Sequence, residues 1–310
     1  MLAAMRILVT GGAGFIASHL TDELVQRGHS VSVIDNLASG QPGNINKSIK
    51  FYFEDICSRS IKAIFKDEKP DCVIHHAAQP DVTTSLRDPW LDAQTNILGF
   101  INVLENSIYC GTREFILASS AAVYGEPIYL GIDEKHRKQP NSFYGLSKYC
   151  SEQYLAIYSR FYGISFTILR YANVYGPRQR NNAEGGVISI FINNMLNGRP
   201  VVIYGNGEQT RDFIYVSDVV AANIKALSNS LNQAINIGTG KSLSLNALYK
   251  LLQQILNIDI PPLYEQPKKG DILHSYLANQ KALHYLNWKP QTDLICGLKK
   301  TIDYASSLPV

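Results

Sequence analysis

The chain has 310 residues, of which 45% are hydrophobic and 18% are charged. A chain of this length and composition can bury a substantial core, which predicts a globular protein of one large domain or two closely joined domains. Its 29 basic and 26 acidic residues give a net charge of +3, and they are spread along the chain without a long basic block. This distribution argues against the extended basic surfaces of proteins that bind nucleic acids or membranes.

The sequence also allows predictions about the cellular location of the protein and about metal binding. Only a few apolar residues precede the charge of Arg6, and no later apolar run is long enough to span a bilayer, so we expect a cytoplasmic protein. The cysteines are odd in number and lack a C-x-x-C pair, which predicts reduced and mostly buried thiols at Cys57, Cys72, Cys110, Cys150 and Cys296. The adjacent His75 and His76 lack further ligands at metal-binding spacing, so no metal site is expected.

Short apolar runs alternate with helical patterns through the first half of the chain. The runs cover residues 6–10, 31–34, 72–74, 115–119 and 166–170, and helices are predicted near 17–27, 89–109 and 144–161. Runs too apolar to alternate are typical of strands buried on both faces of a parallel sheet, so we predict a doubly wound α/β domain over residues 1–175. After Tyr175 the pattern becomes irregular, which predicts a smaller mixed α/β domain over 176–310, with some segments returning to the sheet.

A glycine-rich turn directly follows the first predicted strand. Gly11-Gly12-Ala13-Gly14 fits G-x-G-x-x-G/A from Gly12 and also G-x-x-G-x-x-A from Gly11, with Ala17 in the last position. Such a turn lets backbone N–H groups approach a pyrophosphate, and the following helix N-terminus favours its negative charge. We expect a dinucleotide to contact Gly11, Gly14, Phe15 and Ile16.

An acidic residue ends the second predicted strand. Asp35 lies some twenty residues beyond the glycines and is followed by Asn36. An acid at this place accepts hydrogen bonds from the adenosine ribose hydroxyls and repels a 2′-phosphate. The sequence therefore favours NAD over NADP as the cofactor.

Three further residues have the chemistry of a proton-transfer site. Ser120 follows the strand predicted at 115–119, and Tyr144 and Lys148 lie one turn apart on the same face of a predicted helix. A tyrosine has a pKa of about 10, and a neighbouring cation is the usual means of lowering it. Behind a dinucleotide motif, the three residues predict a hydroxyl, a phenolate base and its supporting cation.

From Arg6 to Trp288 the chain resembles the extended short-chain dehydrogenases/reductases that act on nucleotide sugars, and most closely the UDP-glucose 4-epimerases. The resemblance implies that Tyr144 takes the proton of the sugar 4-hydroxyl while hydride passes to NAD⁺. It further implies that Lys148 tunes this base and binds the nicotinamide ribose, and that Ser120 hydrogen-bonds the sugar oxygen. The transient 4-keto sugar then turns over and receives the hydride on its other face.

The resemblance also implies residues around this centre. On the cofactor side they are Asp55, Ile56, Ala77, Ala78, Gln79 and Asn96. On the substrate side they are Asn173, Gly186, Val187, Arg211, Lys268, Asp271 and Ser275, where Lys268 replaces an arginine of the family pattern. Ser275 stands where enzymes restricted to glucose and galactose often carry tyrosine, so a pocket that also admits UDP-GlcNAc and UDP-GalNAc is our hypothesis.

Three alternatives remain open at this point. A 4,6-dehydratase or decarboxylase shares the oxidation at C4, but a dehydratase needs an Asp-Glu pair where this chain has Ala121-Ala122. A 4-keto reductase would use the same three residues and consume external reduced cofactor, and a non-catalytic NAD-sensing protein would not need them intact. The resemblance also implies a homodimer through the helix of Tyr144, where Tyr154, Leu155, Ile157, Tyr158 and Phe161 would suit either the interface or the core.

Overall fold

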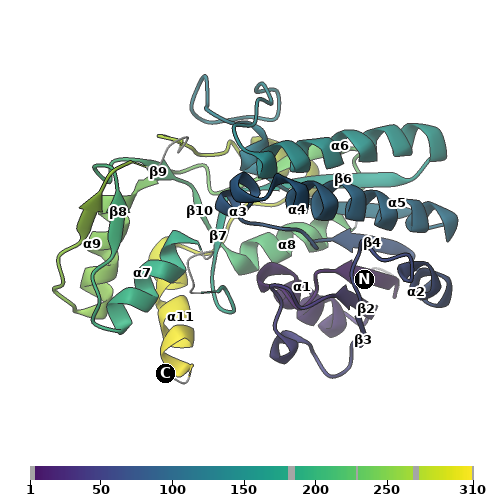
Figure 1. Cartoon of the computed structure of the whole chain (residues 1–310), viewed down its shortest axis with the longest axis horizontal. Coiled ribbons are helices and arrows are strands. Elements are labelled where there is room, and N and C mark those ends of the chain that lie inside the picture. Colours follow the sequence, from purple (N-terminus) through teal and green to yellow (C-terminus); the bar gives the residue numbers. More distant parts are fainter. Residues whose placement is uncertain (1–3, 181–185, 228–229, 268–271, 309–310) are drawn as a thin grey trace.

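A parallel sheet forms the centre of the larger unit of the molecule (Figure 1). The computed structural model describes residues 4–180, 186–227, 230–267 and 272–308. Its largest sheet has seven strands, all parallel, in the order β11-β6-β5-β4-β1-β2-β3. The strands are β1 (Arg6–Thr10), β2 (Ser30–Asp35), β3 (Lys50–Phe53), β4 (Cys72–His75), β5 (Glu114–Ser120), β6 (Ser165–Tyr171) and β11 (Gln233–Ile237). All five apolar runs identified in the sequence are confirmed as strands of this sheet.

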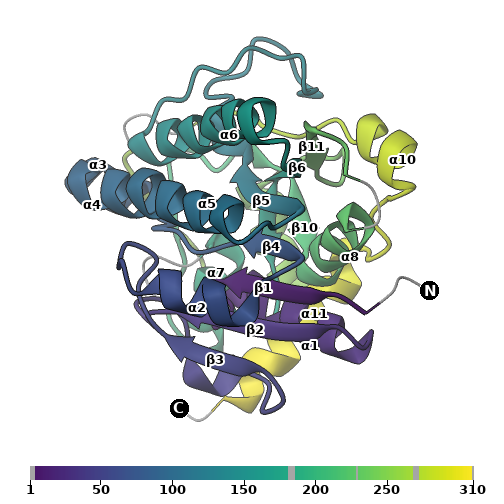
Figure 2. The same ribbon diagram turned by 90° about the vertical axis from the view of Figure 1, so that its right-hand side faces the viewer.

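Helices cover both faces of the sheet, which confirms the doubly wound architecture (Figures 1 and 2). One face carries α1 (Phe15–Gln26), α8 (Val216–Ala226) and α10 (Gln280–Leu286), and the other carries α2 (Ile61–Glu68), α5 (Phe100–Tyr109) and α6 (Phe143–Tyr162). Successive residues of β1 point to opposite faces of the sheet. Ile7 and Val9 belong to the hydrophobic core on the side of α1, and Leu8 belongs to the core on the side of α5. Burial on both sides explains why the strands lack polar alternation.

The helix predicted over 89–109 is not a uniform α-helix. After α3 (Val82–Arg87), it consists of α4 (Pro89–Ala93), a π-helical segment η2 (Gln94–Gly99) and α5. A π-helical turn widens the helix and is frequently found at functional sites. Asn96, one of the predicted site residues, lies within this segment.

A smaller unit packs beside the carboxyl ends of the sheet strands, at the left of Figure 1. Its core lies among α7 (Val187–Leu196), α9 (Leu245–Leu256) and α11 (Leu294–Ser307). Three two-stranded ladders complete it: β7 (Asn173–Tyr175) with β10 (Phe213–Tyr215), β9 (Thr210–Arg211) with β12 (Leu243–Ser244), and β8 (Val202–Tyr204) with β13 (Leu263–Glu265). The range 176–310 also contributes β11, α8 and α10 to the larger unit.

The thiol prediction is only partly right. All five cysteines are free, but only Cys72 is buried, and the other four are half-buried. The strand interior encloses Cys72, whereas the others lie on helices or loops at the edge of the core. Within the described residues, no cluster of three metal-ligating side chains and no helix long and apolar enough to cross a membrane is found.

Candidate active site

The catalytic residues predicted from the sequence meet where β5 ends and α6 begins. Ser120 is the last residue of β5, and its Oγ accepts a hydrogen bond from the backbone N–H of Ala122 at 3.1 Å. Ser142 caps α6 by accepting from the N–H of Gly145 at 3.1 Å, so Tyr144 lies in the first helical turn. There the Tyr144 phenol hydrogen-bonds the Ser120 hydroxyl. The positive end of the helix dipole favours negative charge at this place.

Gly145 permits this close approach of α6 to β5. A Cβ on Gly145 would lie 2.5 Å from the carbonyl oxygen of Ala122. Any side chain here would therefore push the start of α6 away from the turn η3 (Ala121–Val123) that follows Ser120. The close packing of α6 on this turn therefore requires glycine at position 145.

Lys148 lies buried one turn below Tyr144 on the same helix face. The residue is only 6% exposed, and its ammonium group donates to the carbonyl oxygen of Ala118 at 3.1 Å. Loss of solvation lowers the pKa of Lys148 to about 8, against the opposing charges of Asp92 and Glu152. A lysine in this environment remains mainly cationic near neutral pH and titrates within reach of it.

The expected depression of the tyrosine pKa is not seen in the protein alone. Burial raises the pKa of Tyr144, the hydrogen bond from Ser120 lowers it, and the charge of Asp92 raises it. Lys148 therefore does not by itself make Tyr144 a base, because desolvation of the phenolate outweighs the local stabilisation. Further positive charge is needed to favour the ionised form.

Asn96 links the π-helical segment to α6, the helix that carries Tyr144. Its Oδ1 accepts from the N–H of Gln79 at 2.8 Å, and its Nδ2 donates to the carbonyl of Gln79 at 3.0 Å and to Ser147 Oγ at 3.2 Å. Ser151 of α6 donates to the Asn96 carbonyl at 2.8 Å. This buried amide therefore joins the loop after β4 to the helix that carries Tyr144.

The glycine turn after β1 lies at the point where the strand order reverses, between β1 and β4. Gly11 has φ +73°, and a Cβ on it would lie 2.6 Å from the backbone nitrogen of Ala77, which itself donates to Thr10 Oγ1 at 3.3 Å. Gly14 caps α1 without a side-chain acceptor, so the first N–H groups of the helix, at Phe15 and Ile16, are available to an anion. These features fit a dinucleotide pyrophosphate.

Asp35 supports this turn from the end of β2. Its carboxylate accepts from the N–H of Ala13 at 2.9 Å and from the N–H of Leu37 at 2.7 Å, and burial raises its pKa. The neighbouring Asn36 donates to Asp55 Oδ2 at 2.7 Å, and Asp55 Oδ1 accepts from the N–H of Cys57 at 2.7 Å. The acids predicted for ribose and adenine thus lie together beyond the ends of β2 and β3.

The remaining cofactor-side residues lie in the same region. Ile56 is buried against Gly99 at the end of the π-helical segment. Ala77 and Ala78 are half-buried in the loop after β4, and Gln79 ends that loop with Nε2 donating to Asp92 Oδ1 at 3.2 Å. Predicted cofactor residues therefore follow four consecutive strands of the sheet order, as expected for ligands bound at carboxyl strand ends.

On the substrate side, three predicted residues line one small pocket. Asn173, Gly186 and Val187 surround a cavity of about 140 Å³ together with Gln179 and Phe213. Asn173 opens β7, and Gly186 caps α7. A larger hollow of about 590 Å³ near Asn206 and Tyr264 contains none of the predicted residues.

Arg211 and Ser275 lie next to each other beside this pocket. Arg211 Nη1 donates to the carbonyl of Thr210 at 2.9 Å, and the N–H of Ser275 donates to the same carbonyl at 3.1 Å. Asn173 is close to them, since its N–H donates to the carbonyl of Asp212 at 2.9 Å. Lys268 and Asp271 lie outside the described residues.

Several residues in contact with this centre were not identified from the sequence. Asp92 is buried, accepts from Asn96 Nδ2 at 3.0 Å and acts on both Tyr144 and Lys148 through its charge. Glu152 lies one turn beyond Lys148 on the same face of α6. A spacing of four residues separates Asp92 from Asn96 and Lys148 from Glu152, and this spacing is the signal that would have found them.

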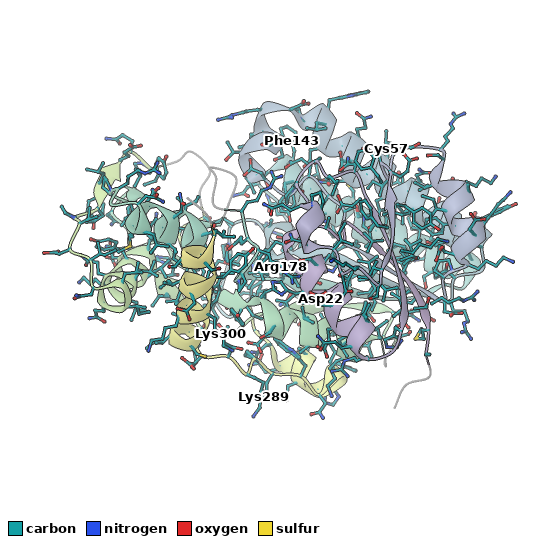
Figure 3. The ribbon with its side chains drawn as sticks, turned by 90° about the horizontal axis from the view of Figure 1, so that it is seen from below. Asp22, Cys57, Phe143, Arg178, Lys289 and Lys300 are labelled. Carbon is teal, nitrogen blue, oxygen red and sulfur yellow. The ribbon has the colours of Figure 1, made fainter. Side chains whose placement is uncertain are left out.

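The segment after β7 connects the substrate side to the nucleotide side. Arg178 forms an ion pair with Asp22 of α1 at 2.8 Å, and the two side chains lie together in Figure 3. His19 Nε2 lies 2.9 Å from the carbonyl oxygen of Pro177, and Arg180 Nη2 donates to the carbonyl of Ala38 at 3.2 Å. These contacts join the two units across the edge that carries the glycine turn.

Known proteins share this fold and align with nearly the whole of this chain. The profile of the NAD dependent epimerase/dehydratase family matches residues 7–238. A putative UDP-glucose 4-epimerase of Methanocaldococcus jannaschii is 46% identical over 96% of this chain and 97% of its own length. The structure of UDP-glucose 4-epimerase from Thermotoga maritima with UDP-glucose has a TM-score of 0.95 at 45% identity, covering 97% of this chain and 98% of that one. UDP-N-acetylglucosamine 4-epimerase from Methanobrevibacter ruminantium, in complex with UDP-N-acetylmuramic acid, has a TM-score of 0.94 at 36% identity over 99% of both chains. The chain therefore belongs to the NAD-dependent epimerase/dehydratase family.

Proposed function

We propose that the protein is an NAD-dependent epimerase that inverts the C4 hydroxyl of a UDP-sugar and interconverts UDP-glucose and UDP-galactose. The observation that carries the proposal is the junction of β5 and α6, where the Tyr144 phenol contacts Ser120 above the buried ammonium of Lys148. The junction lies at the same sheet edge as the glycine turn. Relatives that share nearly the whole chain are described as UDP-glucose 4-epimerases.

The chain's own groups support a proton transfer at the sugar C4 oxygen. Bound NAD⁺ supplies a hydride acceptor and a positive charge. Tyr144, in its ionised form, takes the 4-hydroxyl proton, and Ser120 holds the reacting oxygen by a hydrogen bond. Lys148 keeps a cation near the phenolate, and Tyr144 returns the proton to the C4 oxygen at the end of the cycle.

Of the rival activities, the dehydratase needs groups that this site lacks, and the reductase needs an added reagent. Ala121 and Ala122 carry only methyl groups directly after Ser120, so neither can act as the acid or base that expels a C6 hydroxyl. A 4-keto reductase would share the catalytic residues but would need a reduced cofactor for each turnover. The requirement for added cofactor is therefore the discriminating property.

The test is to incubate the purified protein with UDP-glucose, UDP-galactose and dTDP-glucose in separate samples without added cofactor and to follow the sugars by NMR. We expect the two UDP-hexoses to interconvert. A 4-keto-6-deoxy product, or turnover only after reduced cofactor is added, would refute the epimerase assignment.

A second candidate substrate pair is UDP-GlcNAc and UDP-GalNAc. Ser275 is held beside Thr210 and Arg211 by its backbone N–H, and its side chain is much smaller than the tyrosine of enzymes restricted to glucose and galactose. The relative from Methanobrevibacter ruminantium is described as a UDP-N-acetylglucosamine 4-epimerase. We infer that the pocket accepts an N-acetyl group, which the same NMR assay tests directly.

We further propose that the enzyme acts as a homodimer in the cytoplasm. Tyr154, Ile157 and Phe161 on the outer face of α6 are 39%, 47% and 74% exposed, whereas Leu155 is buried in the sheet core and is not available to an interface. Exposed apolar side chains on one helix face favour association, and free cysteines suit a reducing compartment. Light scattering of Phe161→Asp should give half the mass of the wild type, and an unchanged mass would reject this interface.

A further inference from the structure

One face of α6 contacts three consecutive residues at the end of β5. Tyr144, Lys148 and Glu152 follow one another at intervals of four residues. The first contacts Ser120, the second donates to the carbonyl of Ala118, and the third accepts from Ser119 Oγ at 2.6 Å. Glu152 is therefore the third member of the helix face that carries the catalytic pair.

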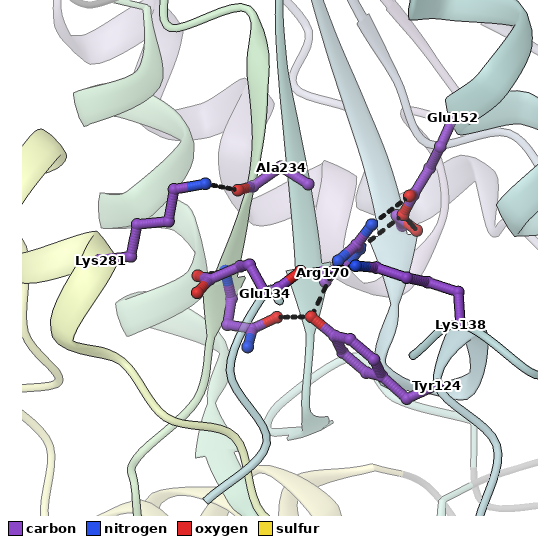
Figure 4. Close-up of polar contacts among 9 residues, drawn as sticks. Tyr124, Glu134, Lys138, Glu152, Arg170, Ala234 and Lys281 are labelled. Atoms are coloured by element: carbon purple, nitrogen blue, oxygen red, sulfur yellow. Dashed lines mark hydrogen bonds and ion pairs between the residues drawn. The ribbon is translucent and has the colours of Figure 1, made fainter. Parts of the chain in front are cut away.

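Glu152 forms a buried two-point ion pair with Arg170 of β6 (Figure 4). Arg170 Nε donates to Glu152 Oε1 at 2.9 Å, and Nη2 donates to Oε2 at 2.5 Å. The two side chains are only 5% and 2% exposed. Because both hydrogen bonds are charge-assisted and the arginine fork is planar, this pair restricts the position of α6 on the sheet.

The remaining donor of Arg170 continues the network away from α6. Arg170 Nη1 donates to the Tyr124 hydroxyl at 2.9 Å, which donates to Asn236 Oδ1 at 2.6 Å. Asn236 lies on β11, and its Nδ2 donates to the carbonyl of Ile132 at 2.8 Å. The polar groups are thus satisfied from α6 through β6 to β11, which makes the ion pair a fixed part of the core.

The geometry points to Glu152 and Arg170 as positioning residues that hold the catalytic face of α6 against β5 and balance the charge beneath Tyr144 and Lys148. This inference rests on the proposed epimerase function. Neither side chain is assigned a contact with the sugar or the cofactor. They act through the hydrogen bond to Ser119 and through their charges, which affect the protonation of Tyr144 and Lys148.

Other charged groups also act on Tyr144 and Lys148. Asp92 faces both Tyr144 and Lys148 from α4, and Glu152 faces Lys148 from α6. The two histidines at the end of β4, His75 and His76, have lowered pKa values because of burial and the charge of Lys148, so they remain neutral. Arg170 forms the ion pair with the carboxylate of Glu152, and Lys138 and Lys148 also interact with this carboxylate through their charges.

Removing one partner should shift the pH dependence in a direction set by the charge that remains. In Glu152→Gln the uncompensated Arg170 favours the deprotonated forms of both Tyr144 and Lys148, so both pKa values fall. In Arg170→Gln the uncompensated Glu152 favours the protonated forms, so both pKa values rise. We expect both limbs of the kcat profile to move by about one pH unit, to lower pH in Glu152→Gln and to higher pH in Arg170→Gln. The double variant should have a profile close to that of the wild type.

The experiment measures kcat for UDP-galactose against pH in these variants, with folding checked by circular dichroism. Glu23→Gln is the matched control, because Glu23 forms an ion pair with Arg27 that is much more exposed than the pair of Glu152 with Arg170, and it should leave the profile unchanged. Arg170→Lys keeps the charge but loses the fork, so it should lower kcat about tenfold or more without moving the limbs. Shifts in the same direction, or none, in two folded single variants would overturn the inference.

Two further measurements keep the test decisive. If a Gln variant does not fold, Arg170→Lys and Ser119→Ala must both lower kcat without loss of bound NAD, and unchanged kcat in either of them rejects the inference. The second measurement is independent of the substrate: ultraviolet absorbance of the phenolate, with Tyr144→Phe as the subtraction in each background, reports the Tyr144 pKa. If the wild type interconverts no UDP-sugar, the proposed function has failed, and this titration still decides whether Glu152 and Arg170 set the charge.

Discussion

The proposed nucleotide half and the proposed substrate half of the site are built differently. In the nucleotide half, Asp35, Asn36 and Asp55 follow neighbouring strands of one sheet and bond to the turns beside them. In the substrate half, Asn173 and Arg211 stand on strands of three and two residues, respectively, in separate ladders that are joined mainly through backbone carbonyls. The first half is organised by a continuous sheet, and the second depends on contacts between distant segments. Changes in the first should therefore abolish binding or turnover, and changes in the second should alter selectivity.

The largest effect is expected at Tyr144, where the two halves meet. Tyr144→Phe removes the proton acceptor but keeps the ring, so kcat should fall about 10³-fold, within the range for loss of a general base. Bound NAD, measured after denaturation of the purified protein, should stay at the wild-type ratio. Turnover close to that of the wild type would remove Tyr144 from the base role.

Gly11→Ala should strongly impair the nucleotide half. The residue has φ +73°, and its new Cβ would lie 2.6 Å from the Ala77 nitrogen, so the turn and the loop after β4 must separate. A left-handed non-glycine residue costs about 1–2 kcal/mol, and the clash adds to this. We expect a lower melting temperature and the loss of most of the bound NAD.

Gly28→Ala separates the two contributions of Gly11→Ala. Gly28 has φ +83° with no described atom within 4 Å of its Cβ position, so it carries the backbone cost alone. It should lower the melting temperature less and retain NAD. Equal loss of NAD in both variants would mean that the contact with Ala77 does not matter.

Much of the larger unit was predictable because local signals agreed with its tertiary structure. Buried parallel strands need apolar runs, which the sequence shows directly. The turn after Thr10 needs a positive φ at Gly11 and space at Gly14, and both requirements favour glycine. The π-helical segment around Asn96 was not predictable, since it depends on hydrogen bonds to Gln79 and Ser151 rather than on residue propensity.

The charge environment was the least predictable part of the site. A cation one turn from Tyr144 suggested a lowered tyrosine pKa, but burial of the phenol and the charge of Asp92 raise it. Sequence spacing shows which groups share a helix face, whereas desolvation depends on everything packed around that face. The same limit applies to Arg170, whose partner Glu152 comes from a different element.

Ser275→Tyr should change selectivity rather than catalysis. The backbone N–H of Ser275 donates to the carbonyl of Thr210, next to Arg211. A tyrosine at this position keeps that backbone hydrogen bond. We expect turnover of UDP-GlcNAc relative to UDP-glucose to fall about tenfold, with kcat for UDP-glucose nearly unchanged. Equal losses for both sugars would show general damage, and an unchanged ratio would show that Ser275 does not limit the pocket.

The smallest effect is expected where Arg178 ties the substrate half to the nucleotide half. Its ion pair with Asp22 is half-buried, and such pairs contribute up to about 1 kcal/mol. Arg178 also has φ +66°, a conformation that costs a non-glycine residue about 1–2 kcal/mol. Arg178→Ala loses the pair and keeps the strained backbone, so it should lower the melting temperature. Arg178→Gly loses the pair but relieves the strain, so it should be at least as stable as the wild type. If both variants lose the same stability, the backbone at 178 is not strained, and the loss reflects only the missing ion pair with Asp22.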